Sequence, residues 1–139
     1  MISVDTNVIV RYLVNDVAEQ ALAARTFLEG LTPEHPAFIC REVAIELVWV
    51  LERAYGFSRA QISDVLVELI ATDSIVVEAA DDVAGAASRY RRGGVGFADL
   101  MVLAAAERAG ATPLHTFDRR LAGVDGAILV NSPAAGAAS

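Results

Sequence analysis

The sequence predicts an α/β domain in which strands of a mostly parallel sheet alternate with helices. Short apolar runs are separated by segments of helical periodicity along the whole chain. This alternation is typical of a parallel sheet with helices on both faces. The 139 residues can bury a sizeable core, and a composition of 55% hydrophobic and 21% charged residues argues against disorder.

The first half of the chain predicts two strands and four helices. An apolar run opens the chain and leads directly into a helix. Asn15 and Asp16 separate this helix from the next, Gly30 ends the second, and Ser58 caps the fourth. The expected strands are 2–5 and 35–39, and the expected helices are 7–14, a segment after Asp16 running to 28, 41–54, and a segment from the Ser58 cap to 71.

The second half predicts three more strands, at 74–77, 112–116 and 127–130, with helices at 81–91 and 97–109 and a helical turn at 118–121. Gly110 ends the longer of these helices. Pro113 must take the first position of its strand, because proline cannot donate to a central ladder. No linker divides the chain, so one domain is expected over 1–139, with a frayed tail at 132–139.

Composition excludes several classes of protein. All 11 basic residues are arginine, which excludes lysine Schiff-base chemistry and the lysine-dependent phosphate loop. The net charge of −7 excludes a general nucleic-acid coat. Cys40 is the only cysteine, so there is no internal disulfide. With no membrane-length apolar run and no secretory signal, a cytoplasmic protein without a membrane span is expected.

Two acids occur where the pattern predicts burial. Asp5 stands between an apolar strand and the apolar face of a helix. Asp99 opens the helix at 97–109 and shares a helical face with Val102 and Leu103. An ionised carboxylate rarely lies in a core without a partner, because losing its hydration is unfavourable by several kcal/mol.

Two further acids are candidates. Asp118 follows the fourth predicted strand, near the sheet edge at which Asp5 is expected. Glu46 interrupts the run VAIELVWVL, but Glu42 lies on the same helical stripe, and spacing does not choose between them. All four acids have ordinary explanations: Asp5 and Asp118 can cap helices, Asp99 can face a helix dipole, and Glu46 can be solvated.

Convergence of these acids favours a metal site. Like charges that gather at one edge need a counter-charge, and oxygen ligands suit Mg²⁺ or Mn²⁺. His35 and His115 are isolated in the sequence, so no softer metal is indicated. Asn7 and Thr116 can add hydrogen bonds around the ion or cap the adjoining helices.

Four segments then resemble a known family, and they occur in its order: VDTNVIVRYL, AIELVWVLERAYG, GFADLMVLAAAERAGA and HTFDRRLAG. The chain resembles the PIN-domain ribonucleases, specifically the VapC-type toxins of type II toxin–antitoxin pairs, from Met1 to Val130. Pro113 and His115 depart from the usual apolar strand before the last acid.

The resemblance implies a three-layer α/β/α fold around a five-stranded sheet and a Mg²⁺-dependent endoribonuclease, with Mn²⁺ as a substitute. It implies hydrolysis of phosphodiester bonds in structured RNA such as tRNA or rRNA, a VapB-type antitoxin and a homodimer. By analogy it selects Glu46 over Glu42. The implied catalytic and metal-binding residues are Asp5, Glu46, Asp99 and Asp118, with Asn7 and Thr116 as auxiliary polar residues.

RNA must approach an acidic protein through local positive charge. The candidates for backbone contacts are Arg89, Arg91 and Arg92 beside the Gly93–Gly94 loop, and Arg119 and Arg120 after the last acid. Both clusters can equally be ion-pair partners of nearby acids. Tyr12, Trp49 and Tyr90 can stack on bases, although such residues more often belong to the core.

Two other functions stay open. A phosphatase or phosphotransfer receiver also uses an aspartate at a strand end, but a receiver usually needs a lysine, and none is present. A catalytically inactive PIN-like module that binds RNA or protein is the alternative outside the enzymes.

Overall fold

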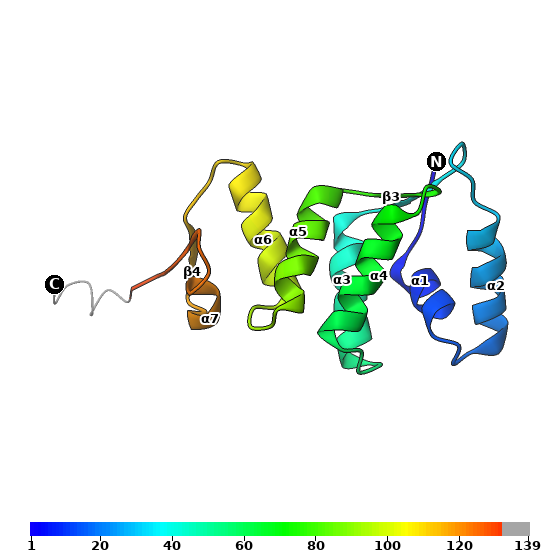
Figure 1. Ribbon diagram of the computed structural model, residues 1–139, viewed down its shortest axis with the longest axis horizontal. Coiled ribbons are helices and arrows are strands. Elements are labelled where there is room, and N and C mark those ends of the chain that lie inside the picture. The colour runs from blue at the N-terminus through cyan, green and yellow to red at the C-terminus, as the bar shows by residue number, and fades with distance from the viewer. Residues whose placement is uncertain (132–139) are drawn as a thin grey trace.

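A parallel three-stranded sheet lies toward one end of the molecule (Figure 1). In the computed structural model, which describes residues 1–131, the strands are β1 (Ile2–Ser3), β2 (Ala37–Ile39) and β3 (Ile75–Val77), in the order β1-β2-β3. Ile2 lies opposite Ala37, and Ala37 lies opposite Ile75. The central strand β2 is the best buried, with Ala37 fully inaccessible to solvent.

Seven helices accompany the strands in the described part of the chain: α1 (Thr6–Leu13), α2 (Ala18–Glu29), α3 (Arg41–Arg53), α4 (Arg59–Ala71), α5 (Ala80–Arg91), α6 (Phe97–Arg108) and α7 (Arg119–Ala122). Ser58 caps α4 as predicted, in a reciprocal capping box with Gln61. The core is built from side chains of β2 and of α1, α3, α4, α5 and α6, among them the fully buried Leu47, Leu51 and Ile62.

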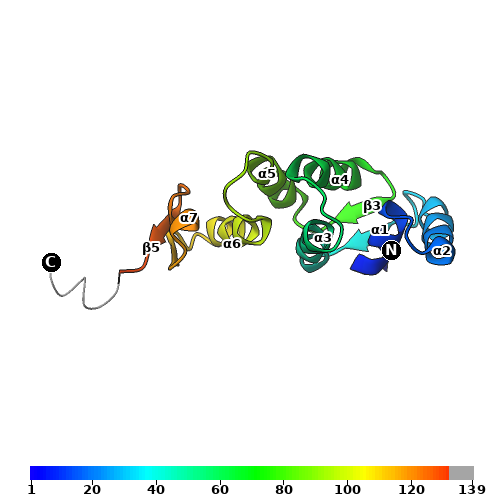
Figure 2. The same ribbon diagram turned by 90° about the horizontal axis from the view of Figure 1, so that it is seen from below.

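A second, two-stranded sheet lies toward the opposite end. It pairs β4 (Leu114–Thr116) with β5 (Ala127–Leu129) in parallel, and α7 connects them. Figures 1 and 2 show that α5 and α6 separate this β4–α7–β5 unit from β1. The described chain is therefore elongated, with one parallel sheet toward each end.

The α/β class and the parallel strand pairing are confirmed. All five expected strands are present, but they lie in two sheets and not in one central sheet, because β4 does not pair with β1. Pro113 precedes β4, as its missing N–H requires. Gly110 follows the end of α6 with a φ of 67°, a left-handed conformation that favours glycine.

The expected tail at 132–139 lies outside the described residues, so the single domain over 1–139 stays a prediction. Within residues 1–131, no helix combines the length and hydrophobicity that crossing a membrane requires.

Candidate functional site

Asp5 and Glu46 line one surface pocket of about 200 Å³. Asp5 is the N-cap of α1, and Glu46 projects from the middle of α3, which packs beside α1. Both side chains are exposed. The prediction that Asp5 is deeply buried is wrong, because β1 has a neighbouring strand on only one side and its outer edge is open.

The capping role considered for Asp5 is real but incomplete. Its Oδ1 accepts a hydrogen bond from the backbone N–H of Thr6 at 2.8 Å, and this bond satisfies one free donor of α1. Within residues 1–131, Oδ2 accepts no hydrogen bond. One oxygen thus holds the helix end while the other can bind a ligand.

Asp99 and Asp118 form a second pair of acids. Asp99 lies in the first turn of α6 and is half-buried. Its pKa is raised, first because burial disfavours the charged form and second because the negative charge of Asp118 is close. Asp118 caps α7 through Oδ1, which accepts from Arg120 N–H at 2.8 Å and from Leu121 N–H at 3.1 Å.

The two pairs do not form one site within a single described chain. Among residues 1–131, no three acidic, histidine or cysteine side chains are grouped so that they could hold a metal ion. The expectation that Asp5 and Asp118 share one sheet edge is wrong within this chain, since they follow strands of different sheets. One chain therefore does not fit the expected four-carboxylate metal site.

Glu46 lies between the two pairs. Besides the pocket of Asp5, it lines a larger groove of about 810 Å³ together with Trp49 and with Phe97 and Ala98 at the start of α6. Glu42 also lines this larger groove, but it does not line the pocket of Asp5. Spacing in the sequence did not choose between Glu42 and Glu46, but only Glu46 lines the pocket of Asp5, and this difference can be tested.

The polar neighbours Asn7 and Thr116 belong to different pairs. Asn7 is exposed and lines the pocket of Asp5 and Glu46. The Thr116 hydroxyl accepts a hydrogen bond from the backbone N–H of Asp118 at 3.0 Å. Thr116 thus orients the loop that carries Asp118.

Arg11 and Tyr55, which are not among the residues predicted from the sequence, also line the pocket with Asp5. Arg11 donates to the Tyr55 hydroxyl at 3.0 Å and pairs with Asp16 at 3.1 Å. The hydrogen bond to Tyr55 is the main reason that the pKa of Arg11 is raised. The available signal was that Arg11 follows Asn7 by one helical turn, which puts both on one face of α1.

The arginine candidates differ in their contacts. Arg91 pairs with Asp64 at 2.8 Å, and Arg120 donates to the carbonyl of Gly94 at 3.2 Å. Arg89, Arg92 and Arg119 are exposed and form no ion pair within residues 1–131. These three guanidinium groups are the ones available to a phosphate backbone.

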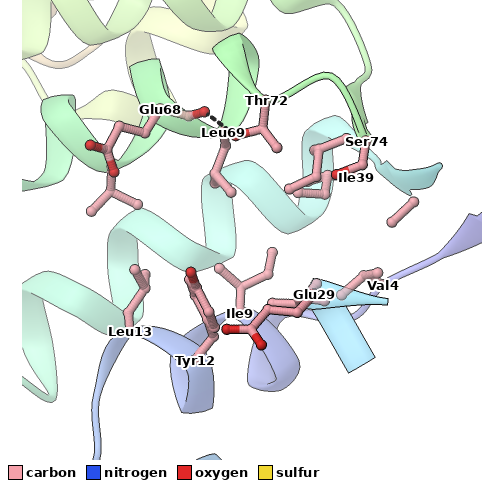
Figure 3. Close-up of a pocket in the computed structure, with 14 residues that line it drawn as sticks. Val4, Ile9, Tyr12, Leu13, Glu29, Ile39, Glu68, Leu69, Thr72 and Ser74 are labelled. Atoms are coloured by element: carbon pink, nitrogen blue, oxygen red, sulfur yellow. Dashed lines mark hydrogen bonds between the residues drawn. The ribbon is translucent and has the colours of Figure 1, made fainter. Parts of the chain in front are cut away.

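Of the aromatic candidates, Tyr90 is fully buried in the core, whereas Trp49 is 59% and Tyr12 is 44% exposed. Tyr12 borders an apolar pocket of about 170 Å³ that is separate from the acids Asp5, Asp99 and Asp118. Figure 3 shows Ile9, Tyr12 and Leu13 of α1 on one side of this pocket and residues of α4 on the other.

A comparison with protein families matches residues 2–127 to the PIN domain. A search of curated proteins finds no match. The family match spans all four acids and almost the whole described chain. PIN domains are typically metal-dependent nucleases. The chain therefore belongs to the PIN domain family.

Proposed function

We propose that this chain is the toxin of a VapBC-type toxin–antitoxin pair, a Mg²⁺- or Mn²⁺-dependent endoribonuclease that acts in the cytoplasm. The observation that carries the nuclease proposal is the pairing of four carboxylates within a chain of this family: Asp5 with Glu46 in one pocket, and Asp99 with Asp118 at the start of α6 and α7.

The raised pKa of Asp99 supports this proposal. A carboxylate that is half-buried beside a second acid is unfavourable in isolation, and this arrangement is common at functional sites. The free Oδ2 atoms of Asp5 and Asp118 supply hard oxygen donors of the kind that Mg²⁺ prefers. Structured RNA such as tRNA or rRNA is the proposed substrate.

A VapB-type antitoxin is the proposed protein partner. The apolar pocket beside Tyr12 offers a binding surface apart from the two acid pairs, and the carboxylates of Glu29 and Glu68 border it. An amphipathic segment with basic flanks would match this chemistry. Co-purification from the native operon that yields no small partner protein would contradict this part of the proposal.

The second candidate function is a PIN-like module that binds RNA or protein without cutting. The observation that favours it is the absence of any three-acid metal group within residues 1–131. The two functions differ in one assay: purified protein is incubated with total tRNA and rRNA in Mn²⁺, and 5′ ends are sequenced. Binding without new 5′ ends would support the non-cutting module.

Asp5→Asn is the matched control for that assay, because it preserves shape and an acceptor oxygen for the Thr6 N–H while removing the charge. We expect cleavage to fall by about 100-fold or more, with unchanged thermal unfolding. The same pair of proteins, expressed under induction, identifies the RNA target in cells. Equal cleavage by the variant would exclude Asp5 from the active site.

A further inference from the structure

In the described residues each sheet has two edge strands, β1 and β3 in one sheet and β4 and β5 in the other. The open edges of β1 and β4 are the ones that lead to Asp5 and Asp118. Ile2 N–H and Val4 N–H donate to Pro36 and Phe38, so both residues face β2, and the N–H and C=O of Ser3 face away from it. In β4, Leu114 N–H donates to Gly126, and the Thr116 carbonyl accepts from Val130.

His115 and Phe117 therefore direct their backbone groups away from β5 in the same way. Among residues 1–131, neither β1 nor β4 has a second neighbouring strand. Open edges of this kind accept another strand.

Apolar side chains accompany both edges. Met1 is 72% and Ile2 is 47% exposed at β1, while Phe117 is 76% exposed at the end of β4. Ile128, in the middle of β5, is 47% exposed. Burying these four large apolar side chains against another protein surface would be favourable.

The β4–α7–β5 unit is held away from the β1 of its own chain. Leu121 of α7 is buried, and a Cβ at Gly126 would lie 3.4 Å from the Leu103 side chain of α6. The Arg120 side chain also binds the carbonyl of Gly94. These contacts fasten the unit to α6 and to the loop before it.

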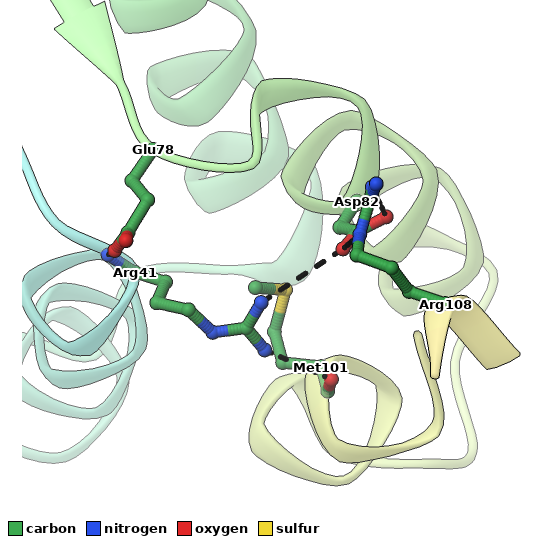
Figure 4. A network of polar contacts seen from close by, with 5 residues as sticks. All are labelled: Arg41, Glu78, Asp82, Met101 and Arg108. Carbon is green, nitrogen blue, oxygen red and sulfur yellow. Dashed lines mark hydrogen bonds and ion pairs between the residues drawn. The ribbon is translucent and has the colours of Figure 1, made fainter. Parts of the chain in front are cut away.

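α6 is fastened in turn to α3 and α5 (Figure 4). Arg108 forms two hydrogen bonds with Asp82 of α5, at 2.6 and 3.0 Å. Arg41 of α3 donates to the Met101 carbonyl at 3.2 Å and lies 3.8 Å from Asp82. Together with the contacts of Arg120 and Gly126, this network holds β4 away from the β1 of its own chain, and pairing with the β1 of another copy leaves all of these contacts intact.

We propose that two copies of this chain exchange strand edges, so that β4 of each copy pairs in parallel with β1 of the other and completes the nuclease site. The hydrogen-bonding directions allow a register that also brings the acids together. Ser3 bonds His115 and Phe117 of the second copy, and so lies opposite Thr116. This produces one continuous sheet, β3-β2-β1 of one copy followed by β4-β5 of the other.

The same register explains why the acids are divided within one chain. Asp5 follows Ser3 by two residues, and Asp118 follows Thr116 by two residues. Opposite positions on neighbouring strands are about 5 Å apart. Asp5 and Glu46 of one copy would thus meet Asp118 of the other, and each dimer would hold two composite sites related by two-fold symmetry.

Cross-linking tests the exchange without any assay of activity. In a Cys40→Ala background, Ile2→Cys is placed in one chain and His115→Cys in another, because the proposed register sets the two positions opposite each other. Neighbouring strands bring Cα atoms within disulfide range. We expect oxidation of the mixed, co-refolded chains to give a covalent heterodimer at micromolar concentration.

A single chain that carries both Ile2→Cys and His115→Cys distinguishes pairing between two copies from pairing of β1 with β4 within one chain. Exchange predicts a covalent dimer on a denaturing gel. Two results of this cross-linking would overturn the proposal: a disulfide within a single chain, or no disulfide at all. A monomeric mass by light scattering would also overturn it, measured at about 100 μM protein, where weak dimers form.

Complementation tests the composite site and rests on the proposed nuclease function. Asp5→Asn and Asp118→Asn are each expected to be inactive. Co-refolding them in equal amounts makes half of the dimers mixed, each with one intact site of two, so about a quarter of wild-type cleavage returns. No recovery would overturn the composite site. If the cysteine variants form cross-linked dimers but the wild-type protein cuts no RNA, the strand exchange is supported and the proposed function is wrong.

Discussion

Asp99 of α6 and Asp118, the cap of α7, are close enough for the charge of Asp118 to raise the pKa of Asp99. This electrostatic effect of one carboxylate on the other acts within a single chain. It predicts a titration that can be measured without substrate.

Replacing Asp118 with Asn should lower the pKa of Asp99 toward its ordinary value of 3.8 without reaching it, because burial is the larger cause of the shift and remains. Carboxyl ¹³C NMR titration measures the change. Asp125→Asn, which removes an exposed acid between α7 and β5, serves as the control. If the pKa of Asp99 is the same in Asp118→Asn as in the wild-type protein, the two carboxylates do not interact.

The two glutamates of α3 should differ in activity. Glu46→Gln should reduce RNA cleavage by about 100-fold, since Glu46 shares a pocket with Asp5. Glu42→Gln should leave cleavage within about 3-fold of wild type, because Glu42 does not line that pocket. The measurement is single-turnover cleavage of the identified RNA. If Glu46→Gln and Glu42→Gln reduce cleavage equally, Glu46 is not the catalytic glutamate of α3.

Arg59 should control the loop that leads to Asp99. Its guanidinium donates to the carbonyls of Tyr90, Gly94 and Val95 and lies 4.4 Å from the Tyr90 ring centroid. Arg59→Met should lower the free energy of unfolding by about 2 kcal/mol, since these carbonyls lose a charged donor.

Hydrogen exchange of Gly93 and Gly94 should rise in the same variant, with Arg53→Met, a nearby exposed arginine, as the control. Unchanged exchange in Arg59→Met would show that the loop is held by other contacts.

The Asp82 network should make stability depend on pH in the acid range. Hydrogen bonding from Arg108 is the main cause that lowers the pKa of Asp82 below its ordinary 3.8. Ionised Asp82 therefore stabilises the fold above pH 3.8, and this contribution is lost as the pH falls through the lowered value.

Asp82→Asn should accordingly unfold at a lower temperature than wild type at pH 7, and the difference should shrink below pH 3.8. Asp81→Asn is the matched control, because Asp81 is exposed and accepts no hydrogen bond within the described residues. Calorimetry across this pH range provides the comparison. A difference independent of pH would indicate lost packing.

Arg92 and Arg119 should contribute to RNA binding more than Arg91. The first two carry unpaired exposed charges within residues 1–131, whereas Arg91 is paired with Asp64. Arg92→Gln and Arg119→Gln should each reduce the slope of log Kd against log salt by about 0.7 for single-stranded RNA. Titrations in the Asp5→Asn background avoid cleavage of the RNA. Unchanged slopes would show that Arg92 and Arg119 do not contact the RNA backbone and would leave Arg89 as the candidate.

The sequence by itself determined the α/β class, the number and order of the strands and the Ser58 cap, and it excluded Pro113 from the interior of β4. These features follow from local periodicity, capping and the missing proline N–H, all of which are written in neighbouring residues. The pattern of acids is equally local, since each follows a strand or lies on a helix face.

Only the tertiary structure decided which acids meet. Whether β4 joins β1 depends on contacts between residues far apart in the chain, among them Arg108 with Asp82 and Gly126 with Leu103. Local periodicity does not encode these contacts, so a single five-stranded sheet and a buried Asp5 were expected in place of two sheets and an exposed carboxylate. Strand pairing between distant segments is determined by packing, and packing here leaves β1 and β4 without each other as partners in the same chain.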